Sequence, residues 1–188
     1  MLITPRSLFI HIPKTGGMWV RAALQDSGLP YYYGPDVHAL PGAIRPVLPG
    51  HYAFTFVRHP VTWWRSLYTY AENKRCWPPC DAMARITSCP PPWEVSYQAF
   101  MAHALAKMPG EYSRLVERYA EGLDYIGRME YLAADLNLIM DTAGEAITVP
   151  VIPAVNASTY SERSVSTPGI DAEITRTERA VIGEFYRS

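Results

Sequence analysis

The same order of elements occurs twice in this chain: a short apolar strand, a loop and a helix. The first copy runs from residues 7–13 through Gly16 and Gly17 into a helix expected over residues 18–25. The second runs from residues 52–58 through Pro60 into a helix expected to end near residue 73. Strands that alternate with helices usually form a parallel sheet covered by helices. We therefore expect an α/β protein with a central parallel sheet flanked by helices in three layers.

The rest of the chain continues this alternation less regularly. Residues 94–121 have a helical pattern that Pro109 and Gly110 interrupt, residues 124–128 form another short strand, and residues 130–142 form a helix. A final helix is expected over residues 171–186. Residues 29–50 carry many glycines and prolines, so we expect only a short strand at residues 31–33 and a short or broken helix at residues 40–48.

The length fits one globular domain. A chain of 188 residues, 48% of them apolar, can bury one good core but is too short for two ordinary domains. The sequence has no internal repeat or low-complexity segment. We therefore expect a single domain that spans residues 1–188.

The charges of the chain nearly balance. Seventeen Lys and Arg residues stand against 18 Asp and Glu residues, a net charge of −1, which removes the broad basic surface of a general nucleic-acid binder. No run approaches the roughly 18 apolar residues of a membrane span, and the first residues do not resemble a signal peptide. We expect a soluble cytoplasmic protein with no nucleic-acid partner, in which any anion site is local. The oligomeric state stays open.

Cys76, Cys80 and Cys89 all lie in residues 74–93, an irregular segment rich in proline. An odd count without a secretion signal argues against disulfides, so free thiols are expected, with no role assigned to them. No paired Cys-x-x-Cys spacing supports a metal site. The segment is longer than most connections in a compact domain, and our hypothesis is that residues 74–93 form a lid over a substrate site.

The first loop has the composition of an anion-binding site. In residues 12–17, Ile-Pro-Lys-Thr-Gly-Gly, Lys14 and two glycines stand where a strand gives way to a helix. Backbone N–H groups, the helix dipole and an ammonium group can converge there on one phosphate or sulfate. The lysine precedes the glycines, unlike the order in nucleoside-triphosphate loops, so ATP or GTP hydrolysis is disfavoured. A plain glycine turn with an exposed lysine is the alternative.

The second strand–loop–helix unit also offers groups that bind anions. Arg58 closes the strand, and Ser66 follows eight residues later, about two helical turns on. A guanidinium fork and a neutral hydroxyl donor suit a terminal phosphate monoester. Taken alone, Arg58 is equally an ion-pair partner and Ser66 an ordinary helix residue.

Together these segments resemble the sulfotransferases that use 3′-phosphoadenosine 5′-phosphosulfate (PAPS). Residues 13–17 are similar to the 5′-phosphosulfate loop of that superfamily, and Arg58-x-Pro60 with Ser66 and Tyr68 is similar to its 3′-phosphate site. Residues 125–132 and 152–158 resemble two later segments of the carbohydrate sulfotransferases, of the heparan sulfate 2-O type and the bacterial type. The similarity is weak between residues 74 and 121.

The resemblance implies a P-loop-like fold and transfer of a sulfuryl group from PAPS to an acceptor, leaving adenosine 3′,5′-bisphosphate and requiring no metal. Lys14 would act as a catalytic residue that neutralises charge on the leaving oxygen, as in phosphoryl transfer. Arg58 and Ser66 would hold the 3′-phosphate and so distinguish PAPS from ATP. The implied cofactor-binding residues are Lys14, Thr15, Gly16, Gly17, Met18, Trp19, Arg58 and Ser66.

The chain departs from its apparent relatives in both motifs. They usually follow the glycine pair with Thr or Ser, whose hydroxyl meets the phosphate, whereas this chain has Met18-Trp19. They commonly place an arginine five residues after Arg58, where this chain has Trp63 and then Arg65 two residues later. Both departures lower the affinity that we expect for the cofactor.

Relatives place a His or Glu general base between the two cofactor motifs. His38, in Asp36-Val-His-Ala, occupies that interval and is the catalytic base that we expect, because imidazole titrates near neutral pH. His51 is the second choice. His11, inside the first strand, is expected to be a buried core residue.

The acceptor is expected to be a small molecule or glycan that presents a hydroxyl group. Thirteen tyrosines and five tryptophans could stack on sugars, although aromatic residues are more often packing elements. The lack of basic runs disfavours a long polyanion. Two alternatives stay open: a small P-loop-like kinase, and a non-catalytic module that binds a nucleotide or a glycan.

Overall fold

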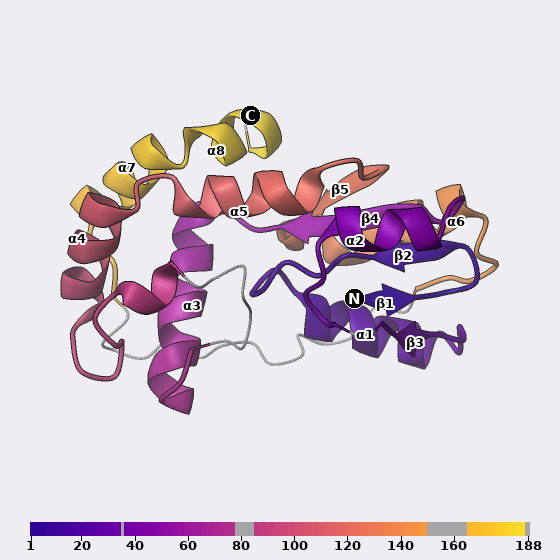
Figure 1. Ribbon diagram of the computed structural model, residues 1–188, viewed down its shortest axis with the longest axis horizontal. Helices are drawn as coiled ribbons and strands as arrows, with labels where there is room; N and C mark the ends of the chain where they lie inside the picture. Colours follow the sequence, from indigo (N-terminus) through magenta and orange to yellow (C-terminus); the bar gives the residue numbers. More distant parts are fainter. Residues whose placement is uncertain (35, 78–84, 150–164, 187–188) are drawn as a thin grey trace. The chain divides into compact units, whose positions relative to one another are not determined.

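The computed structural model describes residues 1–34, 36–77, 85–149 and 165–186 (Figure 1). The chain forms two compact units. The first comprises Met1–Arg58 and Glu117–Ala157, and the second comprises His59–Val116 and Ser158–Ser188. All strands of the described residues belong to the first unit.

The first unit is built on a five-stranded sheet with the order β3-β1-β2-β4-β5. Strands β2 (Ser7–Phe9), β4 (Tyr52–Val57) and β5 (Tyr125–Arg128) run parallel to one another, which confirms the α/β prediction. Strand β1 (Leu2–Ile3) pairs antiparallel with β2 and with β3 (Tyr32–Tyr33), so the sheet is mixed rather than wholly parallel. Only residues 4–6 join β1 to β2, and so short a connection permits only an antiparallel pair.

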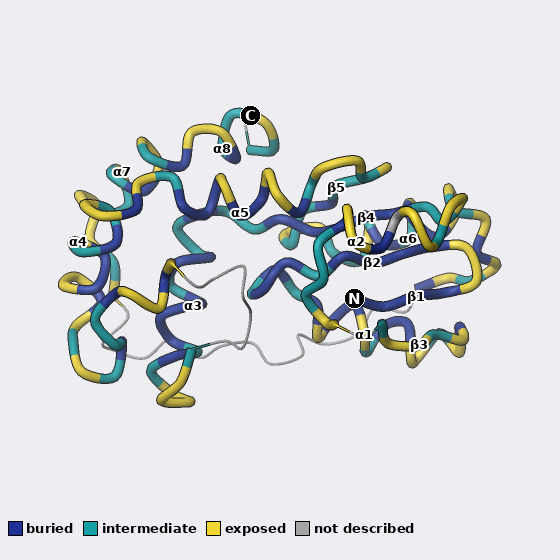
Figure 2. Tube along the Cα trace, in the orientation of Figure 1, coloured by how far each residue is buried: buried dark blue, intermediate teal, exposed yellow. Residues whose placement is uncertain are grey.

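One face of this sheet carries three phenylalanines, Phe9, Phe54 and Phe56, which pack against two helices, α1 (Gly17–Asp26) and α6 (Leu132–Ala143). The alternating residues of β4, such as Ala53 and Val57, point to the opposite face and are also buried (Figure 2). Burial on both faces is typical of parallel strands covered on both sides. The helix predicted over residues 18–25 supplies the core residues Trp19, Val20, Ala23 and Leu24.

The connections of the first unit contain one short helix and two 3₁₀ turns. The segment expected to be a broken helix forms α2 (Pro41–Ile44) followed by a 3₁₀ turn, η1 (Arg45–Val47). Another 3₁₀ turn, η4 (Met129–Tyr131), leads from β5 into α6. Gly28, just after α1, adopts φ of +72°, as expected of a glycine that ends a helix.

The second unit is helical and has an aromatic core. It contains α3 (Pro60–Lys74), η3 (Ile86–Ser88), α4 (Tyr97–Lys107), most of α5 (Glu111–Ala120), α7 (Pro168–Thr177) and α8 (Arg179–Phe185). The predicted interruption at Pro109 and Gly110 separates α4 from α5. Trp63 stacks on Tyr112 with ring centroids 4.3 Å apart, and Trp64, Tyr68, Tyr97 and Phe100 complete the core.

The prediction of one helix over residues 171–186 is wrong, because the chain breaks between α7 and α8 at Glu178. The carboxylate of Glu178 is fully buried and accepts hydrogen bonds at the start of α5: Ser113 donates through its backbone N–H (2.8 Å) and its hydroxyl (2.7 Å). The backbone N–H of Tyr112 and the indole Nε1 of Trp64 also donate to Glu178, each at 3.2 Å. Turning this side chain into the core interrupts the helix.

Parts of the cysteine-rich segment and of the later resemblance lie outside the described residues. These parts are residues 78–84 of the proposed lid, which include Cys80, and residues 152–158. Cys76 is an exposed free thiol and Cys89 a buried one, as expected, and burial raises the pKa of the Cys89 thiol to about 11. Among the helices of the described ranges, none has the length and apolar character that crossing a membrane requires.

Candidate functional site

The loop between β2 and α1 lies at the carboxyl end of the parallel strands. The pairing of β2 with β4 continues beyond Phe9, since the N–H of Ile10 donates to the carbonyl oxygen of Phe54 at 2.8 Å. Residues that follow β2 and β4 therefore emerge at the same edge of the sheet (Figure 1). In α/β sheets this edge is where ligands bind.

The backbone of the loop has the left-handed conformations that also occur in loops that bind anions. Lys14 has φ of +69° and Gly16 has φ of +93°, both in the left-handed region, which turns successive N–H groups to one side. Gly16 caps α1 without a side-chain hydrogen bond, and its carbonyl accepts the N–H groups of Trp19 (2.9 Å) and Val20 (3.1 Å). The N–H groups of Gly17 and Met18, the first two residues of α1, lie at the positive end of the helix.

Both glycines of the loop are required by close packing. A Cβ on Gly16 would lie 2.9 Å from Cδ1 of Leu132, at the start of α6. A Cβ on Gly17 would lie 2.2 Å from Nε2 of His11. The loop is thus backed on one side by the segment of residues 125–132 and on the other by the imidazole ring of His11. Nothing in the spacing of the sequence links these segments.

Two cations meet at this loop. Arg58, which follows β4, donates from Nη1 to the carbonyl oxygen of Lys14 at 3.3 Å. Burial, and then the like charge of Arg58, lower the pKa of the Lys14 ammonium group to about 8. Two positive groups held together at a helix N-terminus form a site that an anion would stabilise.

The other predicted side chains of the loop have different environments. The hydroxyl of Thr15 is buried and donates to the carbonyl oxygen of Ile12 at 2.8 Å, so Thr15 offers the loop its backbone. Trp19 packs in the core beside the sheet, whereas Met18 is 47% exposed. Of the Met18-Trp19 pair that replaces the usual hydroxyl residue, only Met18 faces outwards.

His38 lies beside this loop, on the connection between β3 and α2. Its ring is 4.7 Å from that of His11, and its Nδ1 is 3.0 Å from the backbone oxygen of His11. Burial lowers the pKa of His38, against the effect of that hydrogen bond, so its imidazole is neutral at pH 7. Burial, and then the neighbouring His38, lower the pKa of His11 to about 3. His11 is therefore neutral as well.

The length of β4 separates His51 from the edge where the β2–α1 loop lies. His51 precedes Tyr52, at the amino end of β4, whereas Arg58 follows Val57 at its carboxyl end. A strand of six residues spans about 20 Å. A base must lie within hydrogen-bond reach of the proton that it removes, so the geometry favours His38 over His51.

Tyr119, on the last turn of α5, was missed by sequence reasoning. It is fully buried, and its hydroxyl donates to the carbonyl oxygen of His38 at 2.7 Å. The two residues are 81 positions apart, and a tyrosine on an amphipathic helix gives no sign of such a partner. Only the fold brings them together.

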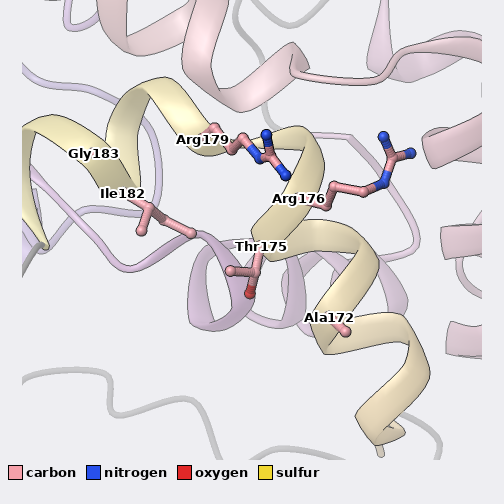
Figure 3. A pocket seen from close by; sticks show the side chains of 6 residues that line it. All are labelled: Ala172, Thr175, Arg176, Arg179, Ile182 and Gly183. Atoms are coloured by element: carbon pink, nitrogen blue, oxygen red, sulfur yellow. The ribbon is translucent and has the colours of Figure 1, made fainter.

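Ser66 belongs to the second unit, where it is buried on α3, so its pairing with Arg58 over one phosphate stays a prediction. The same unit has an open hollow of about 480 Å³ between α7 and α8, and Arg176 and Arg179 lie on its rim (Figure 3). Glu173 pairs with Arg176. The hollow contains none of the predicted site residues.

Within the described ranges, no group of three or more His, Cys, Asp or Glu side chains is arranged to hold a metal ion. In comparisons with protein-family models, curated proteins and solved structures, nothing matched this chain. The functional assignment therefore depends on the site itself and on the motifs.

Proposed function

We propose that this chain is a PAPS-dependent sulfotransferase with a P-loop-like fold, acting on an acceptor hydroxyl, with a carbohydrate as the favoured acceptor. The observation that carries the proposal is the meeting of Lys14, Arg58 and the N-terminus of α1 at the carboxyl edge of the parallel strands. The two positive groups and the backbone N–H groups match an anionic phosphosulfate in charge and in donor geometry.

Each residue of the loop has a role in this proposal. The N–H groups of Thr15, Gly16 and Gly17 would bind the 5′-phosphate, and the ammonium group of Lys14 would stabilise the negative charge that develops on the leaving phosphate oxygen. Arg58 would bind the 3′-phosphate, and Ser66 is the second residue that the resemblance implies for that phosphate. The lysine-before-glycine order and the similarity to sulfotransferase motifs favour PAPS over a nucleoside triphosphate.

In the proposed transfer step, His38 acts as the general base. His38 accepts the hydroxyl proton while the acceptor oxygen forms a bond to sulfur. The bond from sulfur to the phosphate oxygen breaks, and its electron pair stays on adenosine 3′,5′-bisphosphate. Because the imidazole is neutral at pH 7, His38 can take this proton. As in phosphoryl transfer, the protein mainly positions the groups and stabilises charge.

The proposal is tested by incubating the purified protein with labelled PAPS and a panel of mono- and oligosaccharides. We expect an acceptor that takes up label while adenosine 3′,5′-bisphosphate forms in equal amount. His38→Ala should reduce transfer by roughly 10²–10⁴-fold, the usual contribution of a general base, while nucleotide binding is kept. His51→Ala is the matched control and should transfer normally. Nucleotide binding without transfer to any acceptor would indicate the non-catalytic alternative. The absence of both nucleotide binding and transfer would refute the proposal.

A further inference from the structure

His38 is held at three points, two of them on its backbone. Its N–H donates to Oδ1 of Asp36 at 2.8 Å, and its carbonyl oxygen accepts the Tyr119 hydroxyl at 2.7 Å. The third point is the ring nitrogen Nδ1, which is 3.0 Å from the backbone oxygen of His11. Residues on irregular connections are usually more mobile than those in helices and strands, so these three hydrogen bonds indicate that the position of His38 matters.

The third contact determines which nitrogen of the ring carries the proton. A carbonyl oxygen can only accept a hydrogen bond, so Nδ1 must be the donor. In a neutral imidazole, a protonated Nδ1 leaves Nε2 with the lone pair. Nε2 is therefore the basic nitrogen of His38.

The residues packed around His11 restrain the position of its carbonyl oxygen. The imidazole ring of His11 packs against the Cα of Gly17 and against the ring of His38. It also stacks on Phe9, with ring centroids 5.6 Å apart. His11 is thus wedged between the anion loop and His38. The position of the basic nitrogen is tied in this way to the loop that would carry the donor.

We propose that Tyr119, Asp36 and the His11 carbonyl form a clamp that fixes His38 as the Nδ1–H tautomer, with Nε2 as the proton acceptor. Tyr119 and Asp36 act as positioning residues, since they contact the backbone of His38 and not the reacting atoms. The tautomer is a property of the fold, whereas its catalytic use depends on the proposed sulfotransferase activity.

The tautomer is tested by NMR on protein labelled with ¹⁵N-histidine, at pH 8, where the imidazole is neutral. Long-range ¹H–¹⁵N correlations should give His38 a pyrrole-like Nδ1 and a pyridine-like Nε2, with the signals assigned by comparison with His38→Gln. A dominant Nε2–H tautomer or an even mixture would overturn the clamp. This readout needs no substrate, so absence of sulfuryl transfer would leave the clamp standing and refute only the proposed function.

The positioning roles are tested with two variants. Tyr119→Phe removes only the hydroxyl, and Asp36→Ala removes the second restraint from an exposed loop where folding is not at risk. Each should shift His38 towards a mixture of tautomers and lower kcat by roughly tenfold, with KM for PAPS changed by less than about twofold. Asp36→Asn, which keeps the acceptor oxygen, should restore both, and Tyr32→Phe on the exposed edge strand should change neither. An unchanged tautomer and kcat in Tyr119→Phe would remove Tyr119 from the clamp.

Discussion

The protonated ammonium group of Lys14 lowers the stability of the unliganded protein. Its ammonium group is partly buried beside Arg58, and its pKa is lowered from 10.5 to about 8. The folded state therefore holds this proton less firmly than the unfolded state. The resulting penalty is fully present below pH 8 and disappears as the pH rises towards 10.5. A site poised in this way is stabilised when an anion arrives.

Replacement of this lysine should consequently stabilise the unliganded protein. Lys14→Met should raise the free energy of unfolding at pH 7 by at most about 3 kcal/mol, the equivalent of that pKa difference, and by less at pH 9.5. Urea unfolding at the two pH values measures the gain. Lys107→Met, on the exposed surface of α4, is the control and should give no gain. A less stable Lys14→Met protein at pH 7 would contradict this account of the loop.

Gly17 shows how tightly the β2–α1 loop packs on His11. A Cβ at this position would overlap the His11 ring, with Nε2 only 2.2 Å away, so the ring or the loop must move. Gly17→Ala should lower the free energy of unfolding by about 2 kcal/mol, as overpacking usually does, and should weaken nucleotide binding. Gly42→Ala, in α2, is the matched control, because a Cβ on Gly42 would have no neighbouring atom within 4 Å. Equal stability and binding in the two variants would show that the loop tolerates the displacement.

At the scale of elements, Glu178 joins α7 and α8 to the start of α5. Its carboxylate accepts four hydrogen bonds from three residues, two of them through backbone N–H groups at the N-terminus of α5. A buried carboxylate in this place acts as a helix cap supplied from a distant part of the chain. The second unit depends on it for the order of its C-terminal helices.

Glu178→Gln should therefore be strongly destabilising. The NH₂ group of glutamine is a hydrogen-bond donor, and it would face the N–H and O–H donors that now bind the carboxylate. The free energy of unfolding should fall by about 3 kcal/mol and Tm by roughly 10 °C. Calorimetric melting measures it. Glu173→Gln, which alters an exposed ion pair with Arg176 on the same helix, is the control and should leave Tm unchanged. A Tm near that of the wild type for Glu178→Gln would show that the cap contributes little.

The sequence predicted those elements whose signals are local. The strands β2, β4 and β5 and the helices α1 and α3 are marked by apolar runs, glycines and Pro60, and the structure has them within a few residues of the expected bounds. The strand β1 was missed because two residues carry no periodicity. The break at Glu178 was missed because its cause is a contact with Ser113, 65 positions away.

The same distinction applies to the candidate site. The glycine loop, Lys14 and Arg58 could be found from their positions at the ends of two strands, and the fold brings them to one edge. The packing of Gly17 on His11, and the bond from Tyr119 to His38, depend on tertiary contacts that no spacing in the sequence encodes. Sequence reasoning thus found the groups that would touch the donor but not those that hold them in place.

At the scale of the whole molecule, a PAPS-dependent sulfotransferase must bind a nucleotide with phosphates at both the 3′ and the 5′ positions. The most direct test is calorimetric titration with adenosine 3′,5′-bisphosphate, beside ATP, for the wild type and for Lys14→Ala and Arg58→Ala. Gly42→Ala serves as the control variant.

We predict a Kd in the micromolar range or tighter, a binding free energy of about −8 kcal/mol or more favourable, with ATP much weaker. Both substitutions should weaken binding by roughly tenfold or more, the effect of losing one charge-assisted hydrogen bond of about 1.5–3 kcal/mol. Affinity should also fall as the pH rises above 8, because Lys14 then loses its charge. No binding by the wild type, or binding that neither substitution changes, would contradict the assignment of the β2–α1 loop as the donor site.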